Sequence, residues 1–131
     1  MHVSQIMTRD VITVGADSTF MSMQQIFERE AFHHLLVEDN GLLIGVISDR
    51  DIMGNITNQL RKNKLRIPQV VTAADVMTKK VITVDSETPI QTASILLLEN
   101  NISCLPVVDA EYMIEGILSW KDILHYYIYN T

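Results

Sequence analysis

An internal repeat constrains the fold of this chain more than any other feature. The segment Ile6–Asp39 matches Val76–Asp109 at an offset of 70 residues, so that IMTRDVITV lies over VMTKKVITV. After one inserted residue the offset becomes 71, and GVISDRDI (Gly45–Ile52) lies over GILSWKDI (Gly116–Ile123). Two copies that match in the same order, with the insertion where a turn is expected, indicate a duplicated structural unit.

Hydrophobic periodicity predicts the same β-α-β-β-α order in both copies. The first copy predicts strands and helices over Val11–Val14, Thr19–Glu30, His33–Glu38, Leu42–Ile47 and from about Asp49. In the second copy the pattern predicts a strand over the VITV that ends at Val84 and two further strands, Cys104–Val108 and Ile114–Leu118. It also predicts two helices, Thr88–Asn100 and Trp120–Tyr129.

Capping and turn residues support these elements. Asp17–Ser18 and Thr88 offer helix N-cap chemistry, and Pro89 suits the first helical position. Asn40–Gly41 is a typical two-residue hairpin turn.

One copy alone is too small to bury a stable core. We therefore expect an α/β (α+β) fold in which two tandem β-α-β-β-α repeats pack through their sheets, related by a pseudo-twofold axis. The repeats are expected over residues 1–58 and 73–131, with residues 59–72 as a connector. The basic cluster RKNKLR lies in that connector and is interpreted as a solvated segment.

Composition excludes several classes of protein. The net charge of −6 over 131 residues disfavours nucleic-acid binding. A single cysteine, Cys104, excludes a disulfide framework or a multi-cysteine zinc site, and it suits a reducing compartment. The N-terminus has no signal-peptide pattern, and the longest aliphatic run, Ile95–Leu98, is too short to span a bilayer. These features predict a cytoplasmic protein without membrane insertion.

The duplicated motifs, together with CLPVVD, resemble the CBS domain, and the tandem pair resembles a Bateman module. The resemblance runs from about Ser4 to Tyr129. It implies two ligand clefts between the repeats, binding of AMP, ADP, ATP or S-adenosylmethionine as a regulatory ligand, and a homodimer. It implies no catalytic residue, no obligatory cofactor and no metal. The first copy departs from the family pattern because Leu36 stands where the second copy has Pro106.

Two Ser-x-x-Asp motifs, Ser48–Asp51 and Ser119–Asp122, stand at strand-to-helix transitions. One interpretation is a helix cap, in which serine accepts from backbone amides and the acid faces the positive helix end. The other is a ligand site, because a helix N-terminus attracts anions and a carboxylate accepts hydrogen bonds from ribose hydroxyls. The resemblance implies that Asp51 and Asp122 hold ribose and that Ser48 and Ser119 contact ribose or phosphate.

The neighbours of these motifs leave similar alternatives open. Arg50 and Lys121 are either solvated side chains or phosphate ligands, and arginine alone binds a phosphate through two parallel hydrogen bonds. His33 and His34 precede a strand, and the resemblance implies that His34 reaches the ligand. Trp120 either stacks on a base or fills its cleft.

The remaining candidates lie on predicted strands and on the last helix. The resemblance implies backbone and apolar contacts to a base from Val11, Ile12, Val81 and Ile82, which otherwise belong to core strands. Cys104 is interpreted as a buried small hydrophobic residue. An exposed patch is expected at the end of the last helix, where Tyr126, Tyr127 and Tyr129 predict a partner surface.

The leading hypothesis is a non-enzymatic regulatory module that binds an adenine nucleotide or adenosyl ligand and signals to an unidentified regulated protein. The alternative is a ligand-independent dimerisation or protein-interaction module. An enzyme is disfavoured because the sequence shows no metal-spaced cluster, no glycine-rich loop and no nucleophile triad.

Overall fold

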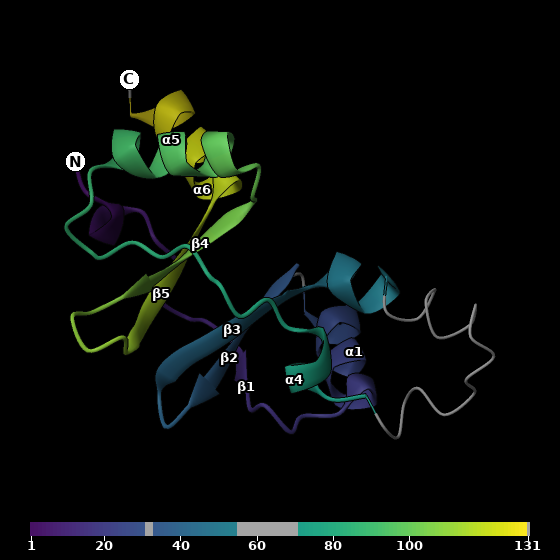
Figure 1. Ribbon diagram of the computed structural model, residues 1–131. Coiled ribbons are helices and arrows are strands. Elements are labelled where there is room, and N and C mark those ends of the chain that lie inside the picture. Colours follow the sequence, from purple (N-terminus) through teal and green to yellow (C-terminus); the bar gives the residue numbers. More distant parts are fainter. Residues whose placement is uncertain (31–32, 55–70, 131) are drawn as a thin grey trace. The chain divides into compact units, whose positions relative to one another are not determined.

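A computed structural model of the chain describes residues 1–30, 33–54 and 71–130 (Figure 1). The predicted connector and its RKNKLR cluster therefore lie outside the described residues, apart from Val71 and Thr72. The chain forms two compact units, one of residues 12–81 and one of residues 1–11 and 82–131. The mixed α and β composition and the two tandem repeats are confirmed.

The unit of residues 12–81 contains a three-stranded sheet. Strand β1 pairs in parallel with β2, and β2 pairs antiparallel with β3. The predicted hairpin turn is confirmed, since Asn40 and Gly41 have φ angles of 52° and 87°. Residues 49–54 begin a helix directly after β3. The elements of this unit are β1 (Thr13–Val14), α1 (Phe20–Arg29), β2 (His34–Asp39), β3 (Leu42–Ser48) and α4 (Ala73–Val76).

The other unit contains a two-stranded antiparallel sheet of β4 and β5. The predicted strand ending at Val84 is reduced to one parallel bridge between Val84 and Val107. Helices α5 and α6 lie against each other in this unit (Figure 1). Its elements are η1 (Val3–Gln5), α5 (Ile90–Asn100), β4 (Cys104–Val108), β5 (Ile114–Ser119) and α6 (Trp120–Tyr129).

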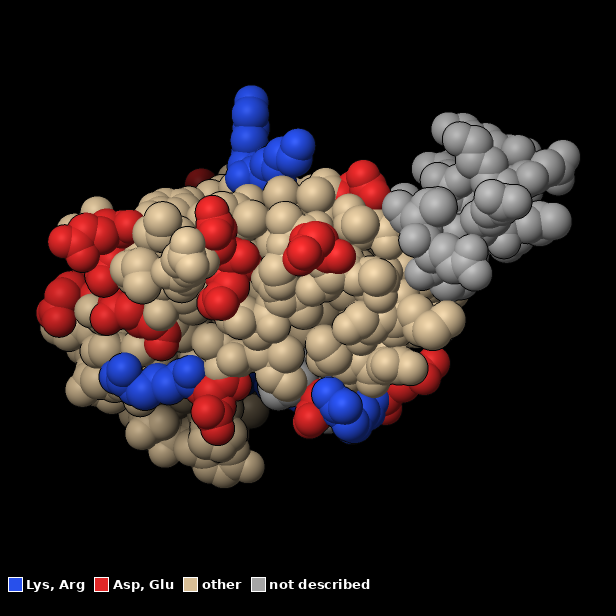
Figure 2. All heavy atoms as spheres, turned by 90° about the horizontal axis from the view of Figure 1, so that it is seen from below, with Lys and Arg blue, Asp and Glu red and all other residues tan. Residues whose placement is uncertain are grey.

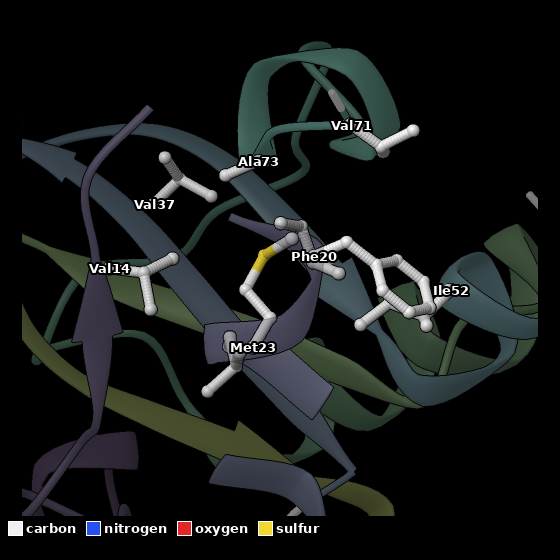
Figure 3. Close-up of a cluster of buried hydrophobic side chains, with 9 residues drawn as sticks. Val14, Phe20, Met23, Val37, Ile52, Val71 and Ala73 are labelled. Atoms are coloured by element: carbon white, nitrogen blue, oxygen red, sulfur yellow. The ribbon is translucent and has the colours of Figure 1, made fainter. Parts of the chain in front are cut away.

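Each unit has its own apolar core, formed by one face of its sheet and its helices. In the first unit, Figure 3 shows Met23 and Phe20 of α1 directed toward side chains from the sheet and from α4. The predicted apolar face of α1 is confirmed, because Ile26 and Phe27 pack against the same cluster. The cores consist of Val14, Phe20, Met23, Leu35, Val37, Ile47, Ile52, Val71 and Ala73, and of Val3, Met7, Val84, Ala93, Leu97, Leu105, Val107, Leu118 and Ile123.

The segment that precedes the first strand of each repeat pairs with a strand of the other repeat. Thr8 and Ile117 exchange two backbone hydrogen bonds of 2.9 Å, so the N-terminal segment extends the sheet of the second repeat. Thr78 and Val46 form the matching pair, at 2.9 and 3.1 Å. Each compact unit therefore contains the entering segment of one repeat and the hairpin of the other.

Two predicted helix caps are wrong by one residue. The N-cap of α1 is Thr19, whose side chain accepts a hydrogen bond from the Ser22 amide, and the Ser18 hydroxyl instead accepts from the Gly15 amide. The N-cap of α5 is Pro89, and the Thr88 hydroxyl accepts from the Asp85 amide. Before α1 one hydroxyl stabilises the preceding turn and another caps the helix, whereas before α5 the Thr88 hydroxyl stabilises only the preceding turn.

Candidate functional site

Both Ser-x-x-Asp motifs form reciprocal caps at the point where a sheet hairpin leads into a helix. The Ser48 amide donates to Asp51 Oδ2 at 2.8 Å, and the Asp51 amide donates to Ser48 Oγ at 3.1 Å. The Ser119 amide donates to Asp122 Oδ2 at 2.9 Å, and the Asp122 amide donates to Ser119 Oγ at 3.2 Å. Both motifs therefore form the helix cap that was one of their two possible roles.

Capping uses only one oxygen of each carboxylate. In the described part of the chain, Oδ1 of Asp51 and Oδ1 of Asp122 accept no hydrogen bond. Both side chains are half-buried at the N-terminus of a helix. Each repeat thus holds a fixed carboxylate with one oxygen available to a ligand.

Two histidines lie near acidic side chains in the first repeat. His34 and Ser48 are directly paired across β2 and β3, so their side chains leave the same face of the sheet. His33 Nδ1 lies 3.0 Å from Asp49 Oδ2. The Arg50 side chain is exposed in the first turn of the helix. The structure therefore brings His34, Ser48 and Asp51 together, with Arg50 beside them.

The same strand position in the second repeat carries no charge. Cys104 is paired with Ser119 as His34 is paired with Ser48. Burial raises the pKa of the Cys104 thiol to about 12, so the thiol stays protonated at neutral pH and the predicted small hydrophobic role is supported. Lys121 is exposed, and the indole of Trp120 is 55% exposed in the first turn of α6.

The titration of His34 gives the first testable prediction. Burial lowers the pKa of its imidazole, and the carboxylates of Asp49 and Asp51 only partly oppose this effect, while His33 adds to it. The folded state therefore favours neutral His34, so stability is present above about pH 6.5 and is lost as the pH falls through the folded pKa. We expect the NMR titration midpoint of His34 to lie below that of an unfolded peptide. We also expect His34→Gln to reduce the loss of stability between pH 7 and pH 5. A midpoint above about 6.5 would contradict this prediction.

A hollow of about 300 Å³ lies beside the carboxylate of the second repeat. Most of its lining was not predicted from the sequence, because it comes from the exchanged N-terminal segment and from later turns of α6. His125 and Tyr126 could have been predicted to lie near Asp122, because they follow it by three and four residues and such residues share a helix face. The hollow is lined by Gln5, Ile6, Asp122, His125, Tyr126 and Asn130.

The four predicted base-contacting residues lie in the segments that lead into the first strand of each repeat. Val11, Ile12, Val81 and Ile82 are all half-buried. Val11 and Ile82 belong to one compact unit, whereas Ile12 and Val81 belong to the other. Leu36 and Pro106, where the two repeats differ, are both fully buried.

Among the residues that the structure describes, no group of three or more His, Cys, Asp or Glu side chains is placed to hold a metal ion. No helix in the described ranges is long and apolar enough to cross a bilayer.

Comparison with known proteins identifies the repeat. The profile of the CBS domain matches residues 3–58 and 73–129. The uncharacterised protein MJ0188 of Methanocaldococcus jannaschii is 30% identical over 133 residues, covering 100% of this chain and 46% of the relative. Several curated relatives are enzymes, and this chain spans only 22% to 24% of their length.

Two solved structures share the fold over nearly the whole chain. The CBS domain pair of protein MJ0100, in complex with 5′-methylthioadenosine and S-adenosyl-L-methionine, is 27% identical with a TM-score of 0.83, covering 100% of this chain and 98% of that one. CBSX2 of Arabidopsis thaliana, in complex with AMP, is 28% identical with a TM-score of 0.84, covering 97% and 96%. The chain belongs to the CBS-domain family and carries two copies of the domain.

Proposed function

We propose that this chain is a non-enzymatic regulatory module that binds an adenine nucleotide or adenosyl ligand and signals its presence to a partner protein. The observation that carries the proposal is Oδ1 of Asp51 and of Asp122, which accepts no hydrogen bond from the described residues and is fixed at a helix N-terminus by its own cap. A carboxylate oxygen held in this way accepts a hydrogen bond from a ribose hydroxyl without further ordering of the side chain.

The groups around each carboxylate complete the proposed site. Ser48 and Ser119 present hydroxyls beside the ribose. Arg50 supplies positive charge for a phosphate in the first repeat, and the exposed Lys121 adds one point charge at the edge of the second site. His34 offers a ring nitrogen to the ligand in the first repeat. The adenine base is proposed to contact the backbone and side chains of Val11, Ile12, Val81 and Ile82.

The ligands of similar structures support this class of ligand. MJ0100 is solved with 5′-methylthioadenosine and S-adenosyl-L-methionine, and CBSX2 with AMP. All three ligands share an adenosine moiety, and a ribose diol is what the two aspartates are suited to accept. ADP and ATP share that moiety, so they are proposed as alternative regulatory ligands.

Surface charge bears on other partners. Figure 2 shows Asp and Glu side chains scattered over the visible face, with few Lys or Arg side chains. A net charge of −6 repels a polyanion, so nucleic acid is not proposed as a partner. The protonated, buried thiol of Cys104 is compatible with the proposed cytoplasmic location.

A homodimer is proposed through an apolar surface on α5 and α6. We call this surface the α5–α6 face. Its members are all uncharged side chains, which suits contact with a second copy of the same acidic chain. The same face supports the alternative function, a dimerisation or protein-interaction module that works without a ligand. It consists of the exposed residues Ile95, Leu98, Trp120, Leu124, Tyr127 and Ile128.

Thermal shift distinguishes the two functions. We expect AMP, ADP, ATP, 5′-methylthioadenosine or S-adenosylmethionine to raise the melting temperature, because a ligand that binds only the folded state stabilises it. Asp51→Asn and Asp122→Asn retain an oxygen for the cap but lose the charge. We expect each substitution to weaken binding at its own site about 10- to 100-fold, the scale of a hydrogen bond to a charged group.

Asp75→Asn is the matched control. Asp75 caps α4 through a 2.8 Å hydrogen bond from the Thr72 amide, in the same geometry as Asp51 and Asp122. This substitution removes the same kind of capping charge but lies outside the proposed site, so ligand affinity should not change. If no adenosyl compound shifts the melting temperature of the wild type, the ligand-independent function is the correct one.

A further inference from the structure

The hollow beside Asp122 differs chemically from the surroundings of Asp51. Among the described residues, no Lys or Arg side chain lines the hollow, and its acidic group is the half-buried Asp122. The rest of its lining consists of two amides, two aromatic rings and one aliphatic side chain. The imidazole of His125 is packed against Tyr129, with ring centroids 4.6 Å apart.

The corresponding position in the first repeat provides no such wall. The repeat offset places Gly54 where the second repeat has His125, and nothing lies within 4 Å of a Cβ built at Gly54. The first repeat instead places the exposed Arg50 next to Asp51 in the first helical turn and the imidazole of His34 near the Asp51 carboxylate, while His33 is paired with Asp49. These groups suit an anion, whereas the lining of the hollow does not.

We propose that the two repeats select different adenosyl ligands: the Asp122 site takes one whose 5′ substituent is an uncharged thioether or a sulfonium, and the Asp51 site takes a 5′-phosphate. This inference rests on the proposed function, because it requires that both aspartates hold ribose. In the second repeat the 5′ substituent lies in the hollow, between the amides of Gln5 and Asn130 and the ring of Tyr126.

The lining of the hollow suits sulfur chemistry. A thioether makes favourable contacts with aromatic rings, and a sulfonium is attracted both by the ring faces and by the Asp122 carboxylate. The Asn130 side chain makes no hydrogen bond within the described residues, so its amide is available to a polar arm of the ligand.

A phosphate is disfavoured in the same place by charge. It would lie beside the Asp122 carboxylate, in a partly enclosed space whose described lining contains no lysine or arginine. Like charges a few ångströms apart repel by about 1 kcal/mol in water and by more where solvent is partly excluded. Lys121 is exposed and does not line the hollow, so it does not compensate this repulsion there.

Isothermal titration of single-site variants tests the assignment. Asp51→Asn leaves the Asp122 site intact, and we expect this variant to bind 5′-methylthioadenosine at least about tenfold more tightly than AMP. Asp122→Asn leaves the Asp51 site intact, and we expect the opposite order. If the wild type binds neither these two compounds nor ADP, ATP or S-adenosylmethionine, the proposed function itself is overturned. If it binds them but the two variants show the same preference, only this inference is overturned.

Adding a positive charge to the hollow is the sharper test. Asn130→Lys removes no side-chain hydrogen bond of the described structure and places a cation near a helix C-terminus, where it is tolerated. In the Asp51→Asn background we expect it to tighten AMP binding about fivefold, the scale of one solvent-screened ion pair, and to leave 5′-methylthioadenosine unchanged. Asn100→Lys, at the exposed end of α5, is the control for charge; because it also removes the 2.9 Å hydrogen bond that Asn100 Nδ2 donates to the Leu96 carbonyl, the stability of both variants is measured alongside. Equal effects of the two lysines would show that the hollow does not hold the 5′ substituent.

Discussion

Replacing Gly116 by alanine is expected to lower the free energy of unfolding by about 3 kcal/mol, the upper range for overpacking a core. A Cβ atom at Gly116 would lie 2.7 Å from the carbonyl oxygen of Thr8 and 3.0 Å from the Met7 sulfur. The Thr8 oxygen belongs to backbone that is held by two hydrogen bonds to Ile117, so it cannot move away without breaking them. The substitution therefore destabilises the pairing between the N-terminal segment and β5.

Chemical denaturation of three glycine variants checks this prediction. Gly45→Ala places its Cβ 2.5 Å from the Met77 sulfur, which is the flexible end of a side chain, so we expect a smaller loss than at Gly116. Gly54 is helical and has open space around it, so Gly54→Ala should raise stability by up to about 1 kcal/mol. Equal losses at Gly54 and Gly116 would show that the contact with Thr8 has no energetic role.

Local sequence pattern predicted the elements well because each has a strong periodic or capping signal. Cys104–Val108 and Trp120–Tyr129 were predicted with their observed bounds. The caps of α1 and α5 were wrong because several residues of capping type stand side by side, and only tertiary context decides which one takes the helix end. The first strand of each repeat is short because only its last residues meet a neighbouring strand.

The exchange of entering segments was not predictable from periodicity. The alternation of Met7–Thr8 and Met77–Thr78 is compatible with pairing at either hairpin, and the repeat makes the two choices alike in local chemistry. The repeat motifs contain Gly45 and Gly116, but the motifs alone do not show why glycine stands there. In the structure, each glycine lies where an entering segment approaches a strand closely.

The candidate site was predicted where spacing alone defines it. The Ser-x-x-Asp spacing gave both caps. The pairing of His34 with Ser48 was not predictable, because it depends on a register shift between Val37 and Glu38 that the hairpin turn does not encode. The hollow beside Asp122 depends on Gln5 and Ile6, which lie more than a hundred residues away in the sequence. Only the exchanged segment brings them to α6, so the lining could not be predicted without the fold.

Placing a charge on the α5–α6 face is expected to separate the proposed homodimer into single chains. Leu98 is 82% exposed on α5, so Leu98→Glu should change the stability of one chain by no more than about 0.5 kcal/mol. In a twofold symmetric dimer the new carboxylate occurs twice in one interface, where it is removed from water and meets a like charge. We expect the dissociation constant to rise at least about 100-fold, which corresponds to about 3 kcal/mol.

Sedimentation equilibrium measures this effect directly. The wild type at micromolar concentration should give twice the chain mass of 14.9 kDa, and Leu98→Glu should give the mass of one chain. Met21→Glu is the matched control, since Met21 is also an exposed apolar residue on a helix, 51% exposed on α1, but lies outside the α5–α6 face. A wild type that sediments only as a single chain would exclude the homodimer. If the two chains meet through the α5–α6 face, Leu98→Glu separates them and Met21→Glu does not. A Met21→Glu variant that dissociates as fully as Leu98→Glu would therefore show that the interface lies elsewhere.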